Sequence, residues 1–144
     1  MRREAGPWAG IYLSDNAGMS WRQQELPVDM MICGRLAVSE APGGEDYIYA
    51  LVTCDSWGYD AGPQGGKGTP HILMSKDAGI TWEDQTDKGG KYYDVTFSPI
   101  MDAAGGQGFF DMMIGASAQN PAHVLFGLTS LYRSTAEGVA NYRN

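Results

Sequence analysis

Basic residues and long apolar runs are both scarce in this chain of 144 residues. Ten Lys and Arg residues stand against 17 Asp and Glu residues, which gives a formal net charge of −7. A nucleic-acid-binding protein would carry a basic stripe, and this sequence has none. No apolar run approaches the roughly 18 residues of a membrane-spanning helix. We therefore expect neither a nucleic-acid partner nor a membrane span.

Metal-ligand spacing and helical periodicity are also missing. His71 and His123 stand far apart without partner ligands, and no stretch has the spacing of a calcium loop, so we expect no metal and no cofactor. Residues 1–6 lack the apolar segment of a signal peptide. Short alternating and continuous apolar runs, by contrast, recur along the chain, and their length and pattern predict an all-β fold.

One eight-residue motif organises the sequence. It reads S-x-D-x-G-x-T-W at residues 75–82 (SKDAGITW) and recurs at residues 14–21 (SDNAGMSW), with Asn for Asp and Ser for Thr. A third copy keeps only Ser134 and Gly138. The three serines lie 61 and 59 residues apart. Such a period, in a chain rich in glycine and aromatic residues, is typical of stacked β-units.

Each motif predicts a tight turn that its own side chains seal. Ser, Asp and Asn side chains fold back onto nearby backbone N–H groups, Gly supplies a positive φ, and Trp covers the turn with apolar surface. We assign the motif a structural role and no catalytic one. The residues concerned are Ser14, Asn16, Gly18, Trp21, Ser75, Asp77, Gly79, Thr81, Trp82, Ser134 and Gly138.

SKDAGITW and SDNAGMSW resemble the Asp-box, or BNR, repeat of sialidases, xyloglucan-cleaving hydrolases and sortilin-type receptors. In that family the box lies on the hairpin between the third and fourth strands of a propeller blade. Residues 34–39 and 47–52 resemble the first two strands of such a blade, and residues 120–127 resemble the entry to a second strand. The resemblance implies a β-propeller-type array of four-stranded antiparallel blades. Because the family is mostly exported, it also implies an extracellular or cell-surface location.

A period near 60 residues allows about 2.4 blades in this length, whereas propellers close with about four to eight. The expected array is therefore an incomplete ring. Residues 1–32 are the end of a blade with the first box, 33–87 a full blade with the second box, and 88–144 a long loop plus a blade with the degenerate third box. The remaining blades come from a longer chain, which we favour, or from further copies.

The expected strands follow the same division. Two strands lie within residues 10–25 and flank the first box. The others are expected at residues 33–39, 47–54, 70–75, 81–86, 111–117, 123–129, 130–134 and 139–143. Long insertions at residues 55–70 and 87–110 then fall at the end of the blades away from the boxes. Function tends to be carried by loops on such a scaffold.

Aromatic rings beside carboxylates in the two insertions suit a carbohydrate, whose C–H faces stack on rings and whose hydroxyls bond to acids. The candidate ligand-binding residues are Trp57, Tyr59, Asp60, Tyr92, Tyr93, Asp94 and Phe110. Asp55 and Asp111 are candidates for the two carboxylates of a glycosidase. The alternative is that the rings pack against their own loops beside solvated aspartates, and that Asp111 caps the turn before a strand.

The resemblance implies a segment of an exported propeller that binds or hydrolyses polysaccharide glycans, most like the xyloglucan-cleaving hydrolases. The alternative is a non-catalytic, sortilin-like propeller that binds protein partners. The Arg-Ile-Pro motif of sialidases is missing, which argues against sialidase activity in this segment.

Cys33 and Cys54 begin and end two strands that we expect to pair as a hairpin. If Gly43 and Gly44 form the turn, Leu36 lies opposite Leu51 and Cys33 lies opposite Cys54, within reach of a disulfide. A longer turn or a bulge would move the two sulfurs to opposite faces of the sheet. A bridge and two buried free thiols therefore both remain open.

Overall fold

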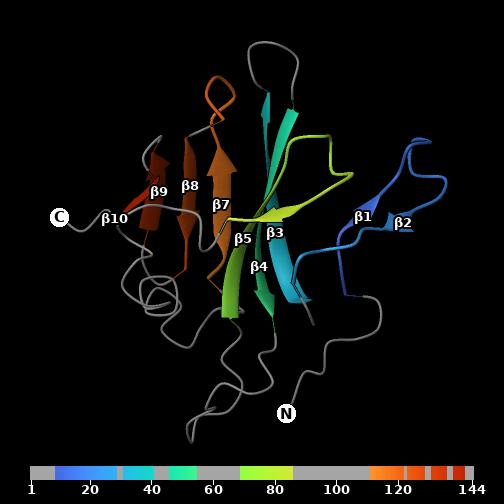
Figure 1. The fold of residues 1–144 in the computed structure, drawn as a ribbon, viewed down its shortest axis with the longest axis horizontal. Coiled ribbons are helices and arrows are strands. Elements are labelled where there is room, and N and C mark those ends of the chain that lie inside the picture. Colours follow the sequence, from blue (N-terminus) through green and yellow to red (C-terminus); the bar gives the residue numbers. More distant parts are fainter. Residues whose placement is uncertain are drawn as a thin grey trace, which may run out of the picture.

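The structure is a computed structural model that describes residues 9–28, 31–40, 46–54, 69–85, 111–121, 123–128, 131–135 and 138–141. Within these ranges every regular element is a β-strand, and the strands form three antiparallel sheets (Figure 1). The prediction of an all-β fold is therefore confirmed. The three sheets do not close on one another.

Consecutive strands are neighbours in each sheet. The first sheet pairs β1 (Tyr12–Leu13) with β2 (Arg22–Gln23). The central sheet contains β3 (Met31–Glu40), β4 (Asp46–Cys54), β5 (Thr69–Ser75) and β6 (Glu83–Asp84), in that order. The last sheet contains β7 (Met113–Ala116), β8 (Val124–Gly127), β9 (Leu131–Thr135) and β10 (Gly138–Asn141). Each predicted strand is present, with ends that differ by a few residues.

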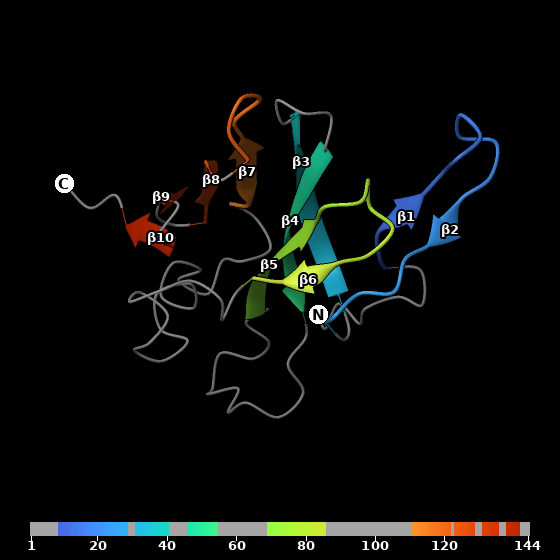
Figure 2. The same ribbon diagram turned by 45° about the horizontal axis from the view of Figure 1, so that its top comes forward.

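The central sheet is covered on both faces, by the first sheet and by the last sheet (Figure 2). One of its two inner strands, β4, is buried from Tyr49 to Cys54. Such a continuous buried run is typical of a strand without a solvent-facing side. Side chains alternate along it, so Leu51 points to one neighbouring sheet and Ala50 and Val52 point to the other.

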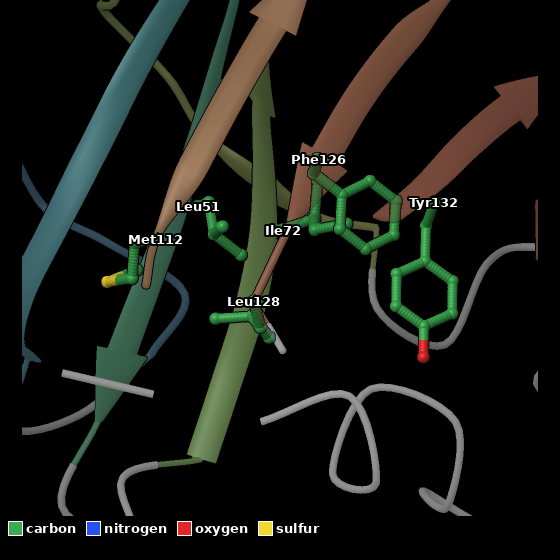
Figure 3. Packing of buried hydrophobic residues seen from close by; sticks show 6 residues of the cluster. All are labelled: Leu51, Ile72, Met112, Phe126, Leu128 and Tyr132. Carbon is green, nitrogen blue, oxygen red and sulfur yellow. The ribbon is translucent and has the colours of Figure 1, made fainter. Parts of the chain in front are cut away.

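Two hydrophobic cores result. The last-sheet core lies between the central and last sheets, and Figure 3 shows its side chains gathered from both: Leu51, Ile72, Met112, Phe126, Leu128 and Tyr132. The rings of Phe126 and Tyr132 stack with their centroids 5.2 Å apart. The first-sheet core lies between the first and central sheets. It contains Ile11, Ala50, Val52, Cys54, Leu73 and Trp82.

Two hydrogen bonds tie the central sheet to the segment between β7 and β8. The hydroxyl of Ser39 donates to the carbonyl of Ser117, and the hydroxyl of Tyr49 donates to the carbonyl of Pro121. Burial, and secondarily the neighbouring Tyr47, raises the pKa of Tyr49 above its usual value of 10.0. The phenol therefore stays protonated at neutral pH and remains a donor.

The predicted register of the β3–β4 hairpin was wrong by one residue. Leu36 lies opposite Ala50 rather than Leu51, and a bulge between Met31 and Cys33 shifts the pairing again. A shift of one residue exchanges the faces of all side chains on a strand. The observed register sets Leu51 opposite Arg35, on the face that the last sheet covers.

Cys33 and Cys54 consequently lie on opposite faces and are free thiols. Cys33 lies opposite Thr53, packs against the last-sheet core, and has its Sγ 3.0 Å from the Thr53 Oγ1. Cys54 belongs to the first-sheet core. A longer turn or a bulge was the condition under which the sulfurs would separate. Glu40 pairs with Asp46 rather than with Tyr47, so the register is already shifted before the bulge, and the structure has the free thiols rather than the bridge.

Candidate functional site

The second box forms a turn closed by its own side chains, as the motif predicts. The Ser75 hydroxyl accepts a hydrogen bond from the Gly79 N–H at 2.8 Å and donates one to Asp77 Oδ1 at 2.8 Å. The Asp77 carboxylate accepts from the Thr81 N–H at 2.8 Å and from the Thr81 hydroxyl at 2.6 Å. The Trp82 indole N–H donates to the Gly79 carbonyl at 3.1 Å.

The first box repeats this network with different side chains. The Ser14 hydroxyl accepts from the Gly18 N–H at 2.7 Å, and Asn16 Oδ1 accepts from the Ser20 N–H at 2.9 Å. The Trp21 indole donates to the Gly18 carbonyl at 3.1 Å. One bond runs the other way, since Asn16 Nδ2 donates to the Ser20 hydroxyl at 2.7 Å. The Asn–Ser pair thus replaces Asp–Thr without loss of the turn.

Both boxes place two consecutive residues at positive φ. The glycines, Gly18 and Gly79, have φ of 83° and 87°, and the alanines before them, Ala17 and Ala78, have φ of 57° and 56°. The motif predicted positive φ at glycine only. An alanine in this region is unusual because its Cβ crowds the following carbonyl oxygen. Both copies have Ala before Gly, but alanine does not indicate a positive φ, so the sequence contained no sign of this second position.

The hydrogen bonds of the second box also determine the charge state of Asp77. Bonds from the Thr81 side chain and then from its backbone, with smaller contributions from Ser75 and the Ile80 backbone, lower the pKa of Asp77 from 3.8 to about 2. The carboxylate is therefore ionised at any physiological pH. It acts as a hydrogen-bond acceptor within the turn and does not supply a proton at neutral pH.

The residues that flank the two insertions lie at one end of the central sheet. Cys54, before the first insertion, lies directly opposite Thr69, near the end of that insertion. Gln85, before the second insertion, donates its N–H to the Ile72 carbonyl at 2.8 Å. The second box begins at Ser75, at the other end of β5. The strands thus carry the insertions at the end of the sheet away from this box.

The candidates within the insertions lie outside the described residues. They are Asp55, Trp57, Tyr59, Asp60, Tyr92, Tyr93, Asp94 and Phe110. Asp111 is described, and it is exposed. It immediately precedes Met112, whose Sδ lies 3.6 Å from the Sγ of Cys33 at the start of the central sheet. Asp111 therefore lies near the start of β3, the end of the central sheet at which the insertions attach.

The third box does not form the same turn. Ser134 pairs with Val139, and Thr135 pairs with Gly138. Strands β9 and β10 are therefore paired at the positions that form the turn in the first and second boxes. Only two residues separate the paired Thr135 and Gly138 in the sequence. The loss of Asp, Thr and Trp from this copy agrees with a short hairpin in place of a box.

One side-chain pair was not foreseen from the sequence. His71 Nδ1 lies 2.8 Å from Asp84 Oδ2, and both side chains are partly buried. His71 lies opposite Val52, and Asp84 lies opposite Leu73, so the pair is on the face toward the first sheet. The carboxylate fixes the orientation of the imidazole ring. Only the register of β5 and β6 brings the two residues together.

Across the described ranges, no group of three or more His, Cys, Asp and Glu residues converges on a metal site. None of the described segments forms a helix long and apolar enough to cross a membrane. In comparisons with known proteins, no family model, curated protein or solved structure matches this chain.

Proposed function

We propose that this chain is a segment of a β-propeller-type array whose insertion end binds a polysaccharide glycan. The observation that carries the proposal is the repeated turn. Two boxes, 61 residues apart, make matching hydrogen bonds. Each joins two strands of one sheet, β1 to β2 in the first sheet and β5 to β6 in the central sheet. The stacked four-stranded antiparallel sheets support a blade-like arrangement. The box itself serves as structure in this proposal.

The arrangement of the central sheet supports a ligand site at the insertion end. Its two faces are covered by neighbouring sheets, which leaves its ends for ligands. A sealed turn occupies one end. At the other end the sequence supplies aromatic and acidic residues in two insertions, and rigid scaffolds commonly carry binding residues on such loops. Rings that stack on sugar faces, beside carboxylates that bond to hydroxyls, favour a glycan.

Hydrolysis would require two carboxylates on either side of a glycosidic bond. Asp55 and Asp111 are the residues we propose for this step. The box aspartate Asp77 is not a candidate acid, because its pKa is held at about 2 by the turn. The resemblance to the Asp-box family extends the proposal to an extracellular or cell-surface location.

Titration against soluble plant and microbial polysaccharides tests the proposal. Trp57→Ala and Tyr93→Ala should each weaken binding about fivefold, since loss of one stacking ring removes about 1 kcal/mol. Ile80→Ala is the matched control, because Ile80 is an exposed apolar side chain on the box turn at the other end of the sheet. It should leave affinity unchanged. Melting temperatures of all three variants separate lost binding from lost folding.

Release of reducing sugar separates binding from hydrolysis. Wild-type activity that Asp111→Asn abolishes, with binding retained, would assign Asp111 to catalysis. Failure of the protein to bind every polysaccharide in the panel would refute the glycan proposal. The sortilin-like alternative, a surface for protein partners, would then be the better account of the insertion end.

A further inference from the structure

A line of three polar side chains crosses the central sheet on the face toward the first sheet. They are Cys54 on β4, His71 on β5 and Asp84 on β6, and these three strands are neighbours. Val52 lies directly opposite His71 and belongs to the first-sheet core. Cys54 lies two residues beyond Val52, and residues two apart on a strand share a face. Cys54 belongs to the same core, so the thiol and the imidazole are on one face.

The line consists of two equal diagonal steps. Asp84 lies opposite Leu73, two residues from His71, and this step brings Asp84 Oδ2 within 2.8 Å of His71 Nδ1. His71 lies opposite Val52, two residues from Cys54. The second step is therefore the same as the first, one strand across and two residues toward the insertion end. Diagonal neighbours in an antiparallel pair lie about 7–8 Å apart, within reach of an aromatic side chain.

The pairing with Asp84 determines which ring nitrogen of His71 is available. The carboxylate accepts the hydrogen bond of Nδ1, so in the neutral ring Nε2 carries the lone pair. Nε2 lies on the far side of the ring from Asp84, and β4, which carries Cys54, is the neighbouring strand on that side of β5. A thiol, an imidazole and a carboxylate in this order match a nucleophile, its base and the group that orients the base.

The three groups differ in their access to solvent. Cys54 is 5% exposed and lies among apolar side chains, whereas the side chains of His71 and Asp84 remain 20% and 26% exposed. A thiol in apolar surroundings holds its proton more tightly than a thiol in water, so Cys54 needs a base to react as a nucleophile. The imidazole is the neighbouring base, and it reaches the surface.

We propose that Cys54 is a nucleophile that accepts an acyl group from an ester, with His71 as its base and Asp84 as the residue that orients the base. Cys54 Sγ forms a bond to the carbonyl carbon of the ester while the thiol proton passes to Nε2 of His71. The bond from this carbon to the alcohol oxygen breaks, and the proton moves from Nε2 to the departing oxygen. The products are a free alcohol and a thioester on Cys54. Water, deprotonated by the same nitrogen, then hydrolyses the thioester to a carboxylic acid and restores the thiol.

The chain contains internal controls for the proposal, because it has two cysteines and two histidines. Cys33 lies on the opposite face of the central sheet, against the last-sheet core, with its Sγ beside the Thr53 hydroxyl. His123 is exposed, and its Nε2 lies near the side-chain amide of Asn120. The acyl transfer requires no glycan, so its outcome is independent of the proposed function.

Reaction with p-nitrophenyl acetate tests the proposal, with acid quenching and peptide mass spectrometry to measure the acetylation of each cysteine. In the wild type, Cys54 should be acetylated at least about tenfold faster than Cys33. His71→Ala and Asp84→Asn should each slow this acetylation at least about tenfold, because a positioned base contributes about 10²–10⁴ in rate. His123→Ala should leave it unchanged. Free imidazole should restore the acetylation of Cys54 in His71→Ala, which a packing role of the histidine would not produce.

Three results would overturn the proposal. They are acetylation of Cys54 no faster than that of Cys33, an acetylation rate that neither His71→Ala nor Asp84→Asn changes, and release of p-nitrophenol that Cys54→Ala leaves unaltered. Far-UV circular dichroism verifies that each variant is folded. If His71→Ala does not fold, His71→Gln retains a hydrogen-bond donor for Asp84 but supplies no base, and it must also slow the acetylation of Cys54.

Discussion

Exchanging alanine and glycine at two adjacent positions of the second box tests the backbone conformation of the turn, because the two substitutions should change stability in opposite directions. Ala78 and Gly79 have φ of 56° and 87°. In this region a Cβ costs about 1–2 kcal/mol, so Ala78→Gly removes that cost from the folded state. The same change raises the entropy of the unfolded chain, which costs about 0.4–1 kcal/mol. The relief of backbone strain outweighs the entropic cost, and we expect net stabilisation of about 0.5–1 kcal/mol.

Gly79→Ala should have the opposite effect. A Cβ at Gly79 would meet Ile48, Leu13 and Trp82 at 3.6, 3.8 and 3.9 Å, which are ordinary van der Waals contacts. Sterics around the turn therefore add little, and the backbone conformation sets a net cost of about 0.5–1 kcal/mol, the mirror of the gain at Ala78. The two adjacent changes should thus shift the free energy of unfolding by similar amounts in opposite directions.

Equilibrium unfolding in urea measures both shifts. Ala37→Gly is the control, since Ala37 lies within β3 and is outside the positive-φ residues; this change should destabilise by about 0.5–1 kcal/mol. A loss of stability in Ala78→Gly equal to that in Ala37→Gly would refute the account of the turn.

Two further predictions concern the same boxes. The folded pKa of Asp77 is about 2, below its usual value of 3.8, so the stability that Asp77 contributes is present above about pH 4 and is lost as pH falls toward 2. Across this window the free energy of unfolding should fall more steeply with decreasing pH for the wild type than for Asp77→Asn. Equal slopes would contradict the conclusion that the ionised Asp77 carboxylate stabilises the turn. Trp82→Ala should lower the free energy of unfolding by about 3–5 kcal/mol, whereas Trp21→Ala, at the matching exposed position, should lower it by about 1 kcal/mol or less. Urea unfolding of both variants measures the two losses. Equal losses of stability would show that burial under the preceding sheet is not what distinguishes the two tryptophans.

Much of the fold is predictable because strands and box turns depend on local sequence. Buried runs such as that of β4 are separated by turn-forming residues. In the first and second boxes, the serine and the Asp or Asn form hydrogen bonds to residues only a few positions away in the sequence. The register of β3 and β4 depends on more. Glu40 pairs with Asp46, whereas a turn formed by Gly43 and Gly44 would pair it with Tyr47, and nothing in the local sequence selects one pairing over the other. The bulge between Met31 and Cys33 then shifts only the pairing of Met31.

The candidate site was less predictable than the fold. The pairing of His71 with Asp84 depends on the register between strands that a box separates, so sequence spacing alone gave no indication of it. Asp111 could be placed before its strand because a glycine-rich segment ends there. Its place at the end of the last-sheet core, however, comes from the packing of Met112, a contact between residues far apart in the sequence.

The alternation of side chains along β4 has a consequence for cooperativity. Leu51 contributes to one core and Val52 to the other, so no sheet contains a complete hydrophobic interior of its own. Free energy then resides in the junctions between sheets, as in a short one-dimensional array with nearest-neighbour coupling. Because β4 is held from both sides, its backbone opens only when the junctions on both of its faces are lost.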